Sequence, residues 1–189
     1  GASFSTTGVY GDTGGGWVDE AAPLLPGTAR ARRRVAQEEA WTEFARSRGV
    51  PLQLFRLSGI YGPGRSPLDR VRAPGARRIV KPGSVFNRIH VDDIVGAVEA
   101  GLAHPEVTGP VNVTDEHPAS SHEVLTAAAE LLGVEPPPEV SFDAAGLSPM
   151  GRSFYAEDRR VAPARLTREL GYRLRYPTYV EGLKALLEG

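Results

Sequence analysis

The 189-residue sequence contains no cysteine, which excludes a disulfide framework and a cysteine-ligated metal site. It has no long uninterrupted apolar run, so no segment is predicted to span a membrane. Its formal net charge is −1, whereas a dedicated nucleic-acid binder is expected to be clearly basic. With 41% hydrophobic and 24% charged residues, the composition is that of a globular protein. We therefore expect a cytoplasmic protein without nucleic-acid or membrane partners.

Lysine is also scarce: the chain has only Lys81 and Lys184, and every other residue counted among Lys and Arg is an arginine. Together with many alanines, glycines and prolines, this bias is typical of a GC-rich bacterial genome, and we do not interpret it as phosphate chemistry. The chain runs from Gly1 directly into a segment with the pattern of a core strand. We expect an amino-terminal piece to precede that strand.

Strand-like and helix-like segments alternate along the chain, which favours a parallel α/β sheet. Strands are predicted at residues 3–9, 52–58, 78–80, 87–91, 110–113 and 139–142. Helices are predicted at residues 29–48, 92–103, 122–132, 163–170 and 179–187. The helix starts carry capping candidates at Thr28, at Asp92 or Asp93, and at Ser120 or Ser121.

Four segments carry a family likeness: STTGVYG at 5–11, RLSGIYGPG at 56–64, RIHVDDI at 88–94 and GPVNVTD at 109–115. Their order and spacing resemble the extended short-chain dehydrogenase/reductases, the NAD-dependent epimerases and dehydratases of sugar nucleotides, and the details are similar to an atypical branch. The resemblance implies the back half of a Rossmann-like, doubly wound parallel sheet at 1–64. It also implies a smaller mixed α/β substrate-side lobe at 65–189, from which about 92–113 returns to the sheet.

The resemblance implies that the protein binds NAD or NADP together with a small-molecule substrate. Members of the family cradle the cofactor pyrophosphate in a glycine-rich turn, but the sequence contains no G-x-G-x-x-G. The nearest candidate, residues 11–16, follows a different strand and is better interpreted as a flexible turn. We therefore expect cofactor binding to require an amino-terminal half. The residues expected to contact the cofactor are Ser5, Thr6, Thr7, Leu57, Ser58, Gly59 and Ile60.

The family chemistry uses a tyrosine base beside a lysine, and a Ser or Thr hydroxyl that holds the substrate oxygen. Thr6 matches the hydroxyl position, although a buried strand threonine bonded to backbone is an equal alternative. The Tyr and Lys positions fall on Arg30 and Arg34. A guanidinium does not lose its proton in proteins, so neither arginine can act as the base. Arg34 could still place a positive charge near the nicotinamide ribose; the alternative is a solvated basic turn at residues 30–34.

On the substrate side, the candidates are Tyr10, Tyr61, Arg65 and Arg88. Both tyrosines follow strands and are more typical of structural turns, while the arginines could hold an anionic group. Two departures weaken the case for a nucleotide-sugar substrate. Gly59 stands where many members carry a substrate-holding Asn, and Phe86 stands where they carry an Arg for the diphosphate.

The segment His90-Val-Asp92-Asp93 could suggest a metal, but no second cluster of ligands accompanies it. A cap at the start of a helix is the favoured interpretation of the aspartates.

Two functional hypotheses remain open. The first is an NAD(P)-dependent oxidoreductase or epimerase acting on a small hydroxyl or carbonyl substrate without the usual Tyr–Lys pair. The second is a non-catalytic dinucleotide-binding sensor or scaffold. The helix at 29–48 presents Ala36, Ala40, Trp41 and Phe44 on one face, which is compatible with a homodimer and equally with core packing.

Overall fold

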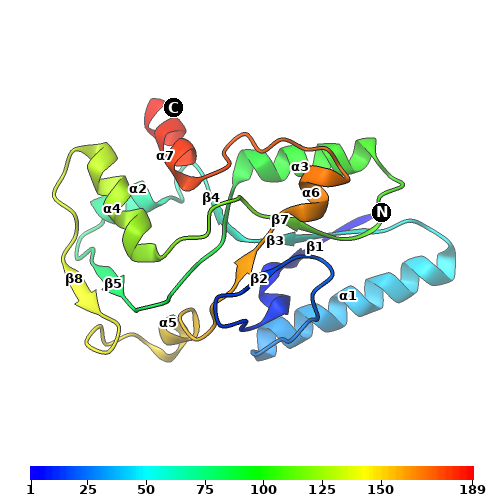
Figure 1. Cartoon of the computed structure of the whole chain (residues 1–189), viewed down its shortest axis with the longest axis horizontal. Helices are drawn as coiled ribbons and strands as arrows, with labels where there is room; N and C mark the ends of the chain where they lie inside the picture. Colours follow the sequence, from blue (N-terminus) through cyan, green and yellow to red (C-terminus); the bar gives the residue numbers. More distant parts are fainter.

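The computed structural model describes residues 1–189 and is built around a three-stranded parallel sheet. The strand order is β1 (Ala2–Thr6), β3 (Gln53–Leu57) and β7 (Gly109–Val113). Helix α1 (Ala29–Arg48) lies on one side of this sheet, and α3 (Val91–Ala103) and α6 (Ala164–Arg168) lie on the other (Figure 1). The predicted α/β class with a parallel sheet is confirmed.

The face of the sheet under α3 and α6 is mainly apolar. Its polar exception is the buried Gln53, whose amide donates to backbone oxygens of Gly101, His104 and Val107. Phe4, Phe55 and Val111 are paired across the three strands and form one row of this face. The buried side chains behind them come from both helices and the segment that follows α6: Ala97, Leu166, Leu170 and Leu174. Two segments that lie far apart in the sequence therefore cover one side of the sheet.

The next row of the sheet, which faces α1, is polar although it is buried. Arg56 forms an ion pair with Glu38 of α1, with 2.7 Å between Nη2 and Oε1 and side-chain exposures of only 5% and 6%. The Ser5 hydroxyl donates to the other Glu38 oxygen, and Arg56 Nη1 donates to the Tyr10 hydroxyl at 3.0 Å. That hydroxyl donates to Asn112 Oδ1 at 2.7 Å. Because each charge is hydrogen-bonded, this network fixes α1 on the sheet.

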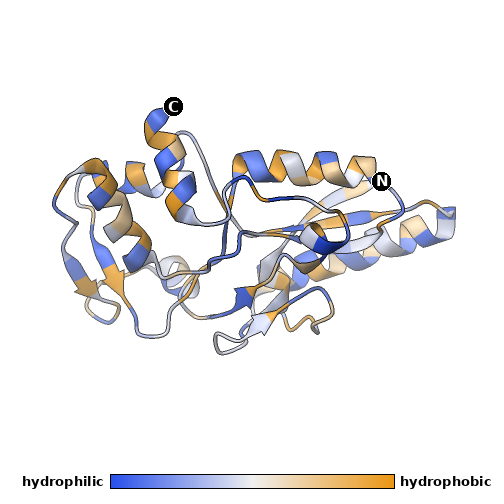
Figure 2. Ribbon diagram, turned by 45° about the horizontal axis from the view of Figure 1, so that its top comes forward, coloured by the Kyte–Doolittle hydropathy of each residue, from blue (hydrophilic) through white to orange (hydrophobic).

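A second lobe lies beside the sheet, at the left of Figure 1. Helices α2 (Pro67–Arg72), α4 (Ser121–Leu132) and α7 (Tyr179–Glu188) share a small core that includes Leu68, Val124, Ala128 and Leu183. The parallel pair β5 (Arg78–Val80) and β8 (Glu139–Ser141) packs beside α4. Orange and blue residues alternate along α3, α4 and α7 in Figure 2, as expected for amphipathic helices.

Two short pairs of parallel strands hold further segments together. Strand β4 (Gly59–Tyr61) pairs with β6 (Arg88–His90), and β2 (Trp17–Val18) pairs with β9 (Arg160–Val161). Helix α5 (Pro149–Ser153) lies shortly before β9. The β2–β9 pair brings the segment that precedes β9 next to the glycine-rich loop at 11–16.

Most predicted helix ends are confirmed, because their signals are local. Thr28 accepts from Ala31 N at the start of α1, and Ser120 and Glu123 form a capping box at α4. The predicted strand at 3–9 is wrong beyond Thr6, where residues Thr7–Tyr10 form a 3-10 turn. The Thr6 hydroxyl accepts from Gly8 N and so starts this turn instead of continuing the strand.

The predicted aspartate cap of α3 is also wrong. His90 Nδ1 accepts from Asp92 N at 3.0 Å and is the side chain that caps the helix. The Asp93 carboxylate accepts from Arg175 N, Tyr176 N and the Tyr172 hydroxyl at 2.6–3.0 Å. Asp93 therefore anchors a distant segment to α3, a role that the local sequence does not reveal.

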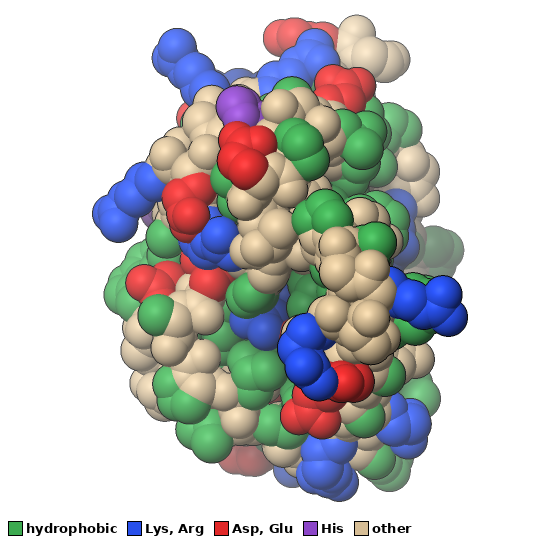
Figure 3. All heavy atoms as spheres, turned by 90° about the vertical axis from the view of Figure 1, so that its right-hand side faces the viewer, with side chains coloured by type: hydrophobic (Ala, Val, Ile, Leu, Met, Phe, Trp, Pro, Cys, Tyr) green, Lys and Arg blue, Asp and Glu red, His purple; other side chains and the backbone are tan.

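The substrate-side lobe expected at 65–189 sends more than residues 92–113 back to the sheet, because α6 and Leu170 also join the main core. The division of the chain at residue 64 stays a prediction. No helix combines the length and the apolar composition needed to cross a membrane. The end of the molecule that carries the N terminus shows charged side chains of both signs between hydrophobic ones (Figure 3).

Candidate functional site

A cavity of about 380 Å³ opens at the carboxyl ends of β1 and β3; we call it the first cavity. Its walls come from the 3-10 turn, the first turns of α1, the end of β3, and the segments at 85–87 and 153–159. Ligands of parallel α/β proteins bind beyond the carboxyl ends of the strands, because loops of adjacent strands meet there. The first cavity therefore occupies the expected place for a ligand.

Hydroxyl groups gather on one wall of the first cavity. Thr6 Oγ1 accepts from Gly8 N at 3.1 Å, which leaves its own O–H free to donate. Thr7 Oγ1 and Ser58 Oγ lie 3.5 Å apart across the ends of β1 and β3. The wall can thus hold a substrate or cofactor oxygen.

Two arginines of α1 also line the first cavity. Arg30 and Arg34 stand one helical turn apart and reach the same cavity as Thr6. The Arg30 guanidinium lies 5.6 Å from the centre of the Phe154 ring, and Arg34 Nη1 donates to Phe4 O at 3.5 Å. No tyrosine lines the first cavity, so its walls hold cations where the family resemblance implies a Tyr–Lys pair.

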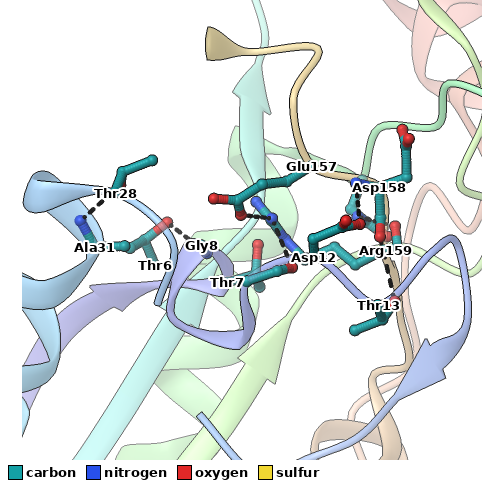
Figure 4. A network of polar contacts seen from close by, with 12 residues as sticks. Thr6, Thr7, Gly8, Asp12, Thr13, Thr28, Ala31, Glu157, Asp158 and Arg159 are labelled. Atoms are coloured by element: carbon teal, nitrogen blue, oxygen red, sulfur yellow. Dashed lines mark hydrogen bonds and ion pairs between the residues drawn. The ribbon is translucent and has the colours of Figure 1, made fainter. Parts of the chain in front are cut away.

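The segment before β9 contributes charged residues that the sequence did not single out. Glu157 Oε2 accepts from Arg159 Nη1 at 2.9 Å, and the same nitrogen donates to Gly11 O at 3.1 Å (Figure 4). A Cβ atom on Gly8 would lie 3.4 Å from Thr6 Oγ1 and 3.9 Å from Arg159 Nη2. Gly8 therefore keeps space open between the hydroxyl wall and this ion pair.

This segment is held firmly by backbone contacts. Asp158 O accepts from Thr13 N at 2.9 Å and from Gly15 N at 3.0 Å. Asp158 N in turn donates to the Asp12 carboxylate, and Asp12 also accepts from Gly14 N. These backbone donors hold the pKa of Asp12 below its usual range. The loop at 11–16 and the segment at 157–161 thus fix each other.

A second cavity of about 720 Å³ adjoins the first and shares Gly59, Phe86, Asn87 and Phe154 with it. Several other residues that line the second cavity are apolar, but Arg88 also lines this cavity. Arg88 Nη1 donates to Phe86 O and Ala119 O at 3.2 and 2.9 Å, and the guanidinium forms no ion pair. Burial lowers the pKa of Arg88, because desolvation disfavours its charge. An anion in this cavity would relieve that cost.

Two buried acids lie near Arg88: Tyr61 lines the second cavity, whereas Asp115 does not line it and donates through its backbone N to Arg88 O at 2.8 Å. Tyr61 is 5% exposed and its hydroxyl has no partner, so burial raises its pKa. Asp115, which follows β7, accepts from His117 N through Oδ1 at 2.9 Å, while Oδ2 has no partner. Burial raises the pKa of Asp115 to about 7, and the positive charge of Arg88 opposes this shift.

The structure brings most of the predicted site residues together. Thr6, Thr7, Leu57, Ser58, Gly59 and Arg34 line the first cavity, and Gly59, Ile60, Tyr61, Arg65 and Arg88 line the second.

Ser5 and Tyr10 line neither cavity, and their cofactor-side and substrate-side assignments stay predictions. Ser5 points to the α1 face of its strand, where it bonds Glu38. Tyr10 is fully buried beside Arg56 and Asn112 because the 3-10 turn directs it inward.

The sequence analysis missed Glu157, Arg159 and Phe154, all of which line the first cavity. The only sequence feature that could have indicated them is the run of charged residues at 157–160. Nothing local connects that run to Thr6, since the connection depends on the two-residue β2–β9 pair. The structure shows no group of three or more His, Cys, Asp or Glu side chains that could hold a metal ion.

No protein-family model matches the chain. Among curated proteins, Protein YeeZ of Escherichia coli is 30% identical over 178 residues, which cover 92% of this chain and 57% of YeeZ. A 3-diazoavenalumate denitrifying reductase of a Streptomyces species is 31% identical over 182 residues, covering 88% of this chain and 58% of the reductase. The chain thus spans little more than half the length of the curated relatives it matches.

Solved structures share the fold over nearly the whole chain. A functionally unknown conserved protein from Silicibacter pomeroyi matches with a TM-score of 0.91 and 49% identity, over 99% of this chain and 65% of that one. The human epimerase family protein SDR39U1 with NADPH has a TM-score of 0.81 at 19% identity, over 100% and 65%.

A dTDP-glucose 4,6-dehydratase from Streptomyces venezuelae with NAD bound has a TM-score of 0.79 at 19% identity, over 99% of this chain and 58% of that one. An epimerase family protein of Mycobacterium bovis is 30% identical over 128 residues, 65% of this chain and 42% of that protein. The chain therefore has part of the Rossmann-like fold that these epimerase and dehydratase structures share.

Proposed function

We propose that the protein is an NAD(P)-dependent oxidoreductase or epimerase-like enzyme for a small hydroxyl or carbonyl substrate. The nicotinamide end of the cofactor would occupy the first cavity and the substrate would extend into the second. The observation that carries this proposal is the meeting of the two cavities at Gly59, beside the hydroxyl wall at the strand ends. Related structures that contain NAD or NADPH support it.

The residues of the first cavity fit the nicotinamide and ribose end of a dinucleotide. A cavity of about 380 Å³ has the size of a small-ligand site, and Thr7 and Ser58 offer hydroxyls to a ribose or carboxamide. When bound, the dinucleotide would accept or supply a hydride. The Thr6 hydroxyl would hold the substrate oxygen, and Arg34 would place a positive charge beside the nicotinamide ribose.

The second cavity favours a substrate with an anionic group on an apolar body. The half-buried Arg88 side chain forms no ion pair, and exposed Arg65 lines the same cavity. Carboxylate and phosphate groups suit an arginine fork, because its N–H groups match their oxygens. Phe86 lines the cavity where a diphosphate-binding arginine was expected, so we do not assign a nucleotide sugar.

A non-catalytic dinucleotide sensor or scaffold is the second candidate. It is favoured by Arg30 and Arg34, which line the first cavity at the positions matched to the Tyr–Lys pair and cannot act as bases.

We also propose that two copies associate through α1. Ala36 and Ala40 are exposed on this helix, and Trp41 and Phe44 are each 49% exposed. Large side chains so open to water favour an interface over the alternative of core packing.

The test of the enzymatic proposal is fluorescence titration of the full-length protein, with the expected amino-terminal half present, using NADH and NADPH, followed by turnover assays on a panel of carboxylate-bearing carbonyl compounds. Binding of one cofactor together with turnover supports the enzyme. Binding without turnover on the panel favours the sensor. No binding of either dinucleotide would contradict both candidates.

A further inference from the structure

The reaction proposed for the first cavity requires a group that can exchange a proton, and one carboxylate lines the cavity. The other polar side chains are hydroxyls, guanidiniums and the amide of Asn87, none of which gives up or gains a proton readily near neutral pH. We propose that Glu157 is the catalytic residue that moves the substrate proton, with Arg159 as its positioning residue. This inference rests on the proposed enzymatic function.

The geometry of Glu157 suits this role. Oε2 is held by Arg159 Nη1 at 2.9 Å, whereas Oε1 makes no hydrogen bond and remains available. The side chain is only 16% exposed. A Cβ atom on Gly27 would lie 2.7 Å from Oε1, which places this oxygen against the residue preceding the α1 cap. The free oxygen therefore stands at the entrance of α1, where Thr28 and Arg30 line the same cavity.

Arg159 orients the carboxylate through contacts on both of its sides. Its Nη1 also donates to Gly11 O, and its backbone oxygen accepts from Asn87 Nδ2 at 2.9 Å. Figure 4 shows Glu157 beside the Thr6–Gly8 turn, with Arg159 between it and the loop at 11–16. Catalytic groups act efficiently when their surroundings fix them before substrate binds. The pair is therefore preorganised by the same backbone contacts that fix the segment at 157–161.

The proposed step balances in both directions. In oxidation, Glu157 takes the proton of the substrate hydroxyl as the O–H bond breaks and the C=O bond forms, and the hydride of the carbinol carbon leaves to the oxidised dinucleotide. In reduction, a protonated Glu157 gives its proton to the carbonyl oxygen as hydride arrives at the carbon. Thr6 donates a hydrogen bond to that oxygen throughout. Glu157 exchanges its proton with solvent through its exposed edge.

The test compares the native protein with Glu157→Gln, which keeps the size of the side chain and an oxygen for Arg159. We expect an unchanged melting temperature and NADPH affinity, and kcat lower by roughly 10²-fold or more. KM should change little, and the pH dependence of kcat should flatten. Glu157→Asp should recover part of kcat, and formate should restore turnover to Glu157→Ala. Glu43→Gln, which also breaks an ion pair with an arginine but on the exposed face of α1, is the matched control.

The outcomes separate this inference from the function on which it rests. Native turnover that survives in Glu157→Gln with the same pH profile would overturn the inference alone. Loss in Glu157→Gln of whichever dinucleotide the native protein binds, with no recovery of kcat in Glu157→Asp, would make the residue structural and also overturn the inference. A native protein that binds no dinucleotide, or binds without turnover, removes the enzymatic function and the inference together.

Discussion

At the scale of single residues, the most consequential feature is that charges are buried on the sheet and around the cavities. A buried charge is tolerated only when hydrogen bonds and an opposite charge compensate its lost hydration. Glu38 and Arg56 meet this condition, whereas Asp115 keeps one oxygen without a partner. Removing Glu38 should therefore lower the free energy of unfolding, whereas for Asp115 it is the ionised form of the side chain that should lower it.

Replacing Glu38 with alanine should destabilise the protein strongly. Arg56 would keep only the hydroxyl of Tyr10 and would remain buried at 5% exposure. We expect the free energy of unfolding to fall by about 3–5 kcal/mol, the usual cost of breaking one side of a buried ion pair. Urea denaturation measures this, with exposed Glu39→Ala as the control. A loss below about 1 kcal/mol would contradict the assigned role of the pair.

Asp115 should make stability depend on pH. Its pKa is raised to about 7 in the folded state against about 4 in the unfolded chain. Between these values the folded state binds more protons, so the free energy of unfolding falls as pH rises from about 4 to about 7. The contribution is on the order of 4 kcal/mol, at ~1.4 kcal/mol per pH unit. In denaturation curves measured across that pH range, Asp115→Asn should reduce the dependence of the free energy of unfolding on pH. An unchanged dependence would contradict the assigned role of Asp115.

At the scale of elements, local signals predicted the regular structure and failed where distant segments meet. Thr28 and the Ser120–Glu123 box predicted helix starts correctly, because capping is decided within one turn. The cap of α3 is also local, but it was missed because His90 is not among the residue types that usually cap helices. The role of Asp93 was missed because its partners lie about 80 residues later. The same reason explains why Glu157 was absent from the predicted site.

The exposed face of α1 leads to a prediction about assembly. Trp41 and Phe44 contact edge to face with ring centres 6.0 Å apart, and both remain half exposed. If this face joins two copies, Trp41→Glu combined with Phe44→Glu should yield a monomer, because charges resist burial in an apolar contact. Light scattering after size-exclusion chromatography measures the mass. The proposal fails if the native protein is a monomer at high concentration, or if the variant has the native mass.

At the scale of the whole molecule, the family resemblance placed residues from distant segments in one region. Thr6, Ser58 and Arg34 were predicted from separate motifs and line one cavity. The resemblance could do this because motif order fixes which strands end side by side. It could not place residues 153–159, since no motif covers them and their position depends on β2 pairing with β9.

The most direct test of the account is NADH and NADPH binding at the first cavity of the full-length protein, which includes the expected amino-terminal half, with Gly8→Leu as the blocking variant. A Cβ on Gly8 has room, and its φ is not positive, so the turn should form while a longer side chain fills the space between Thr6 and Arg159. Ala103→Leu, on the exposed end of α3, is the control. The account predicts that the native protein and the control bind one dinucleotide and that Gly8→Leu loses at least tenfold in affinity, about 1.4 kcal/mol. Equal binding by Gly8→Leu, or no binding by the native protein, would contradict it.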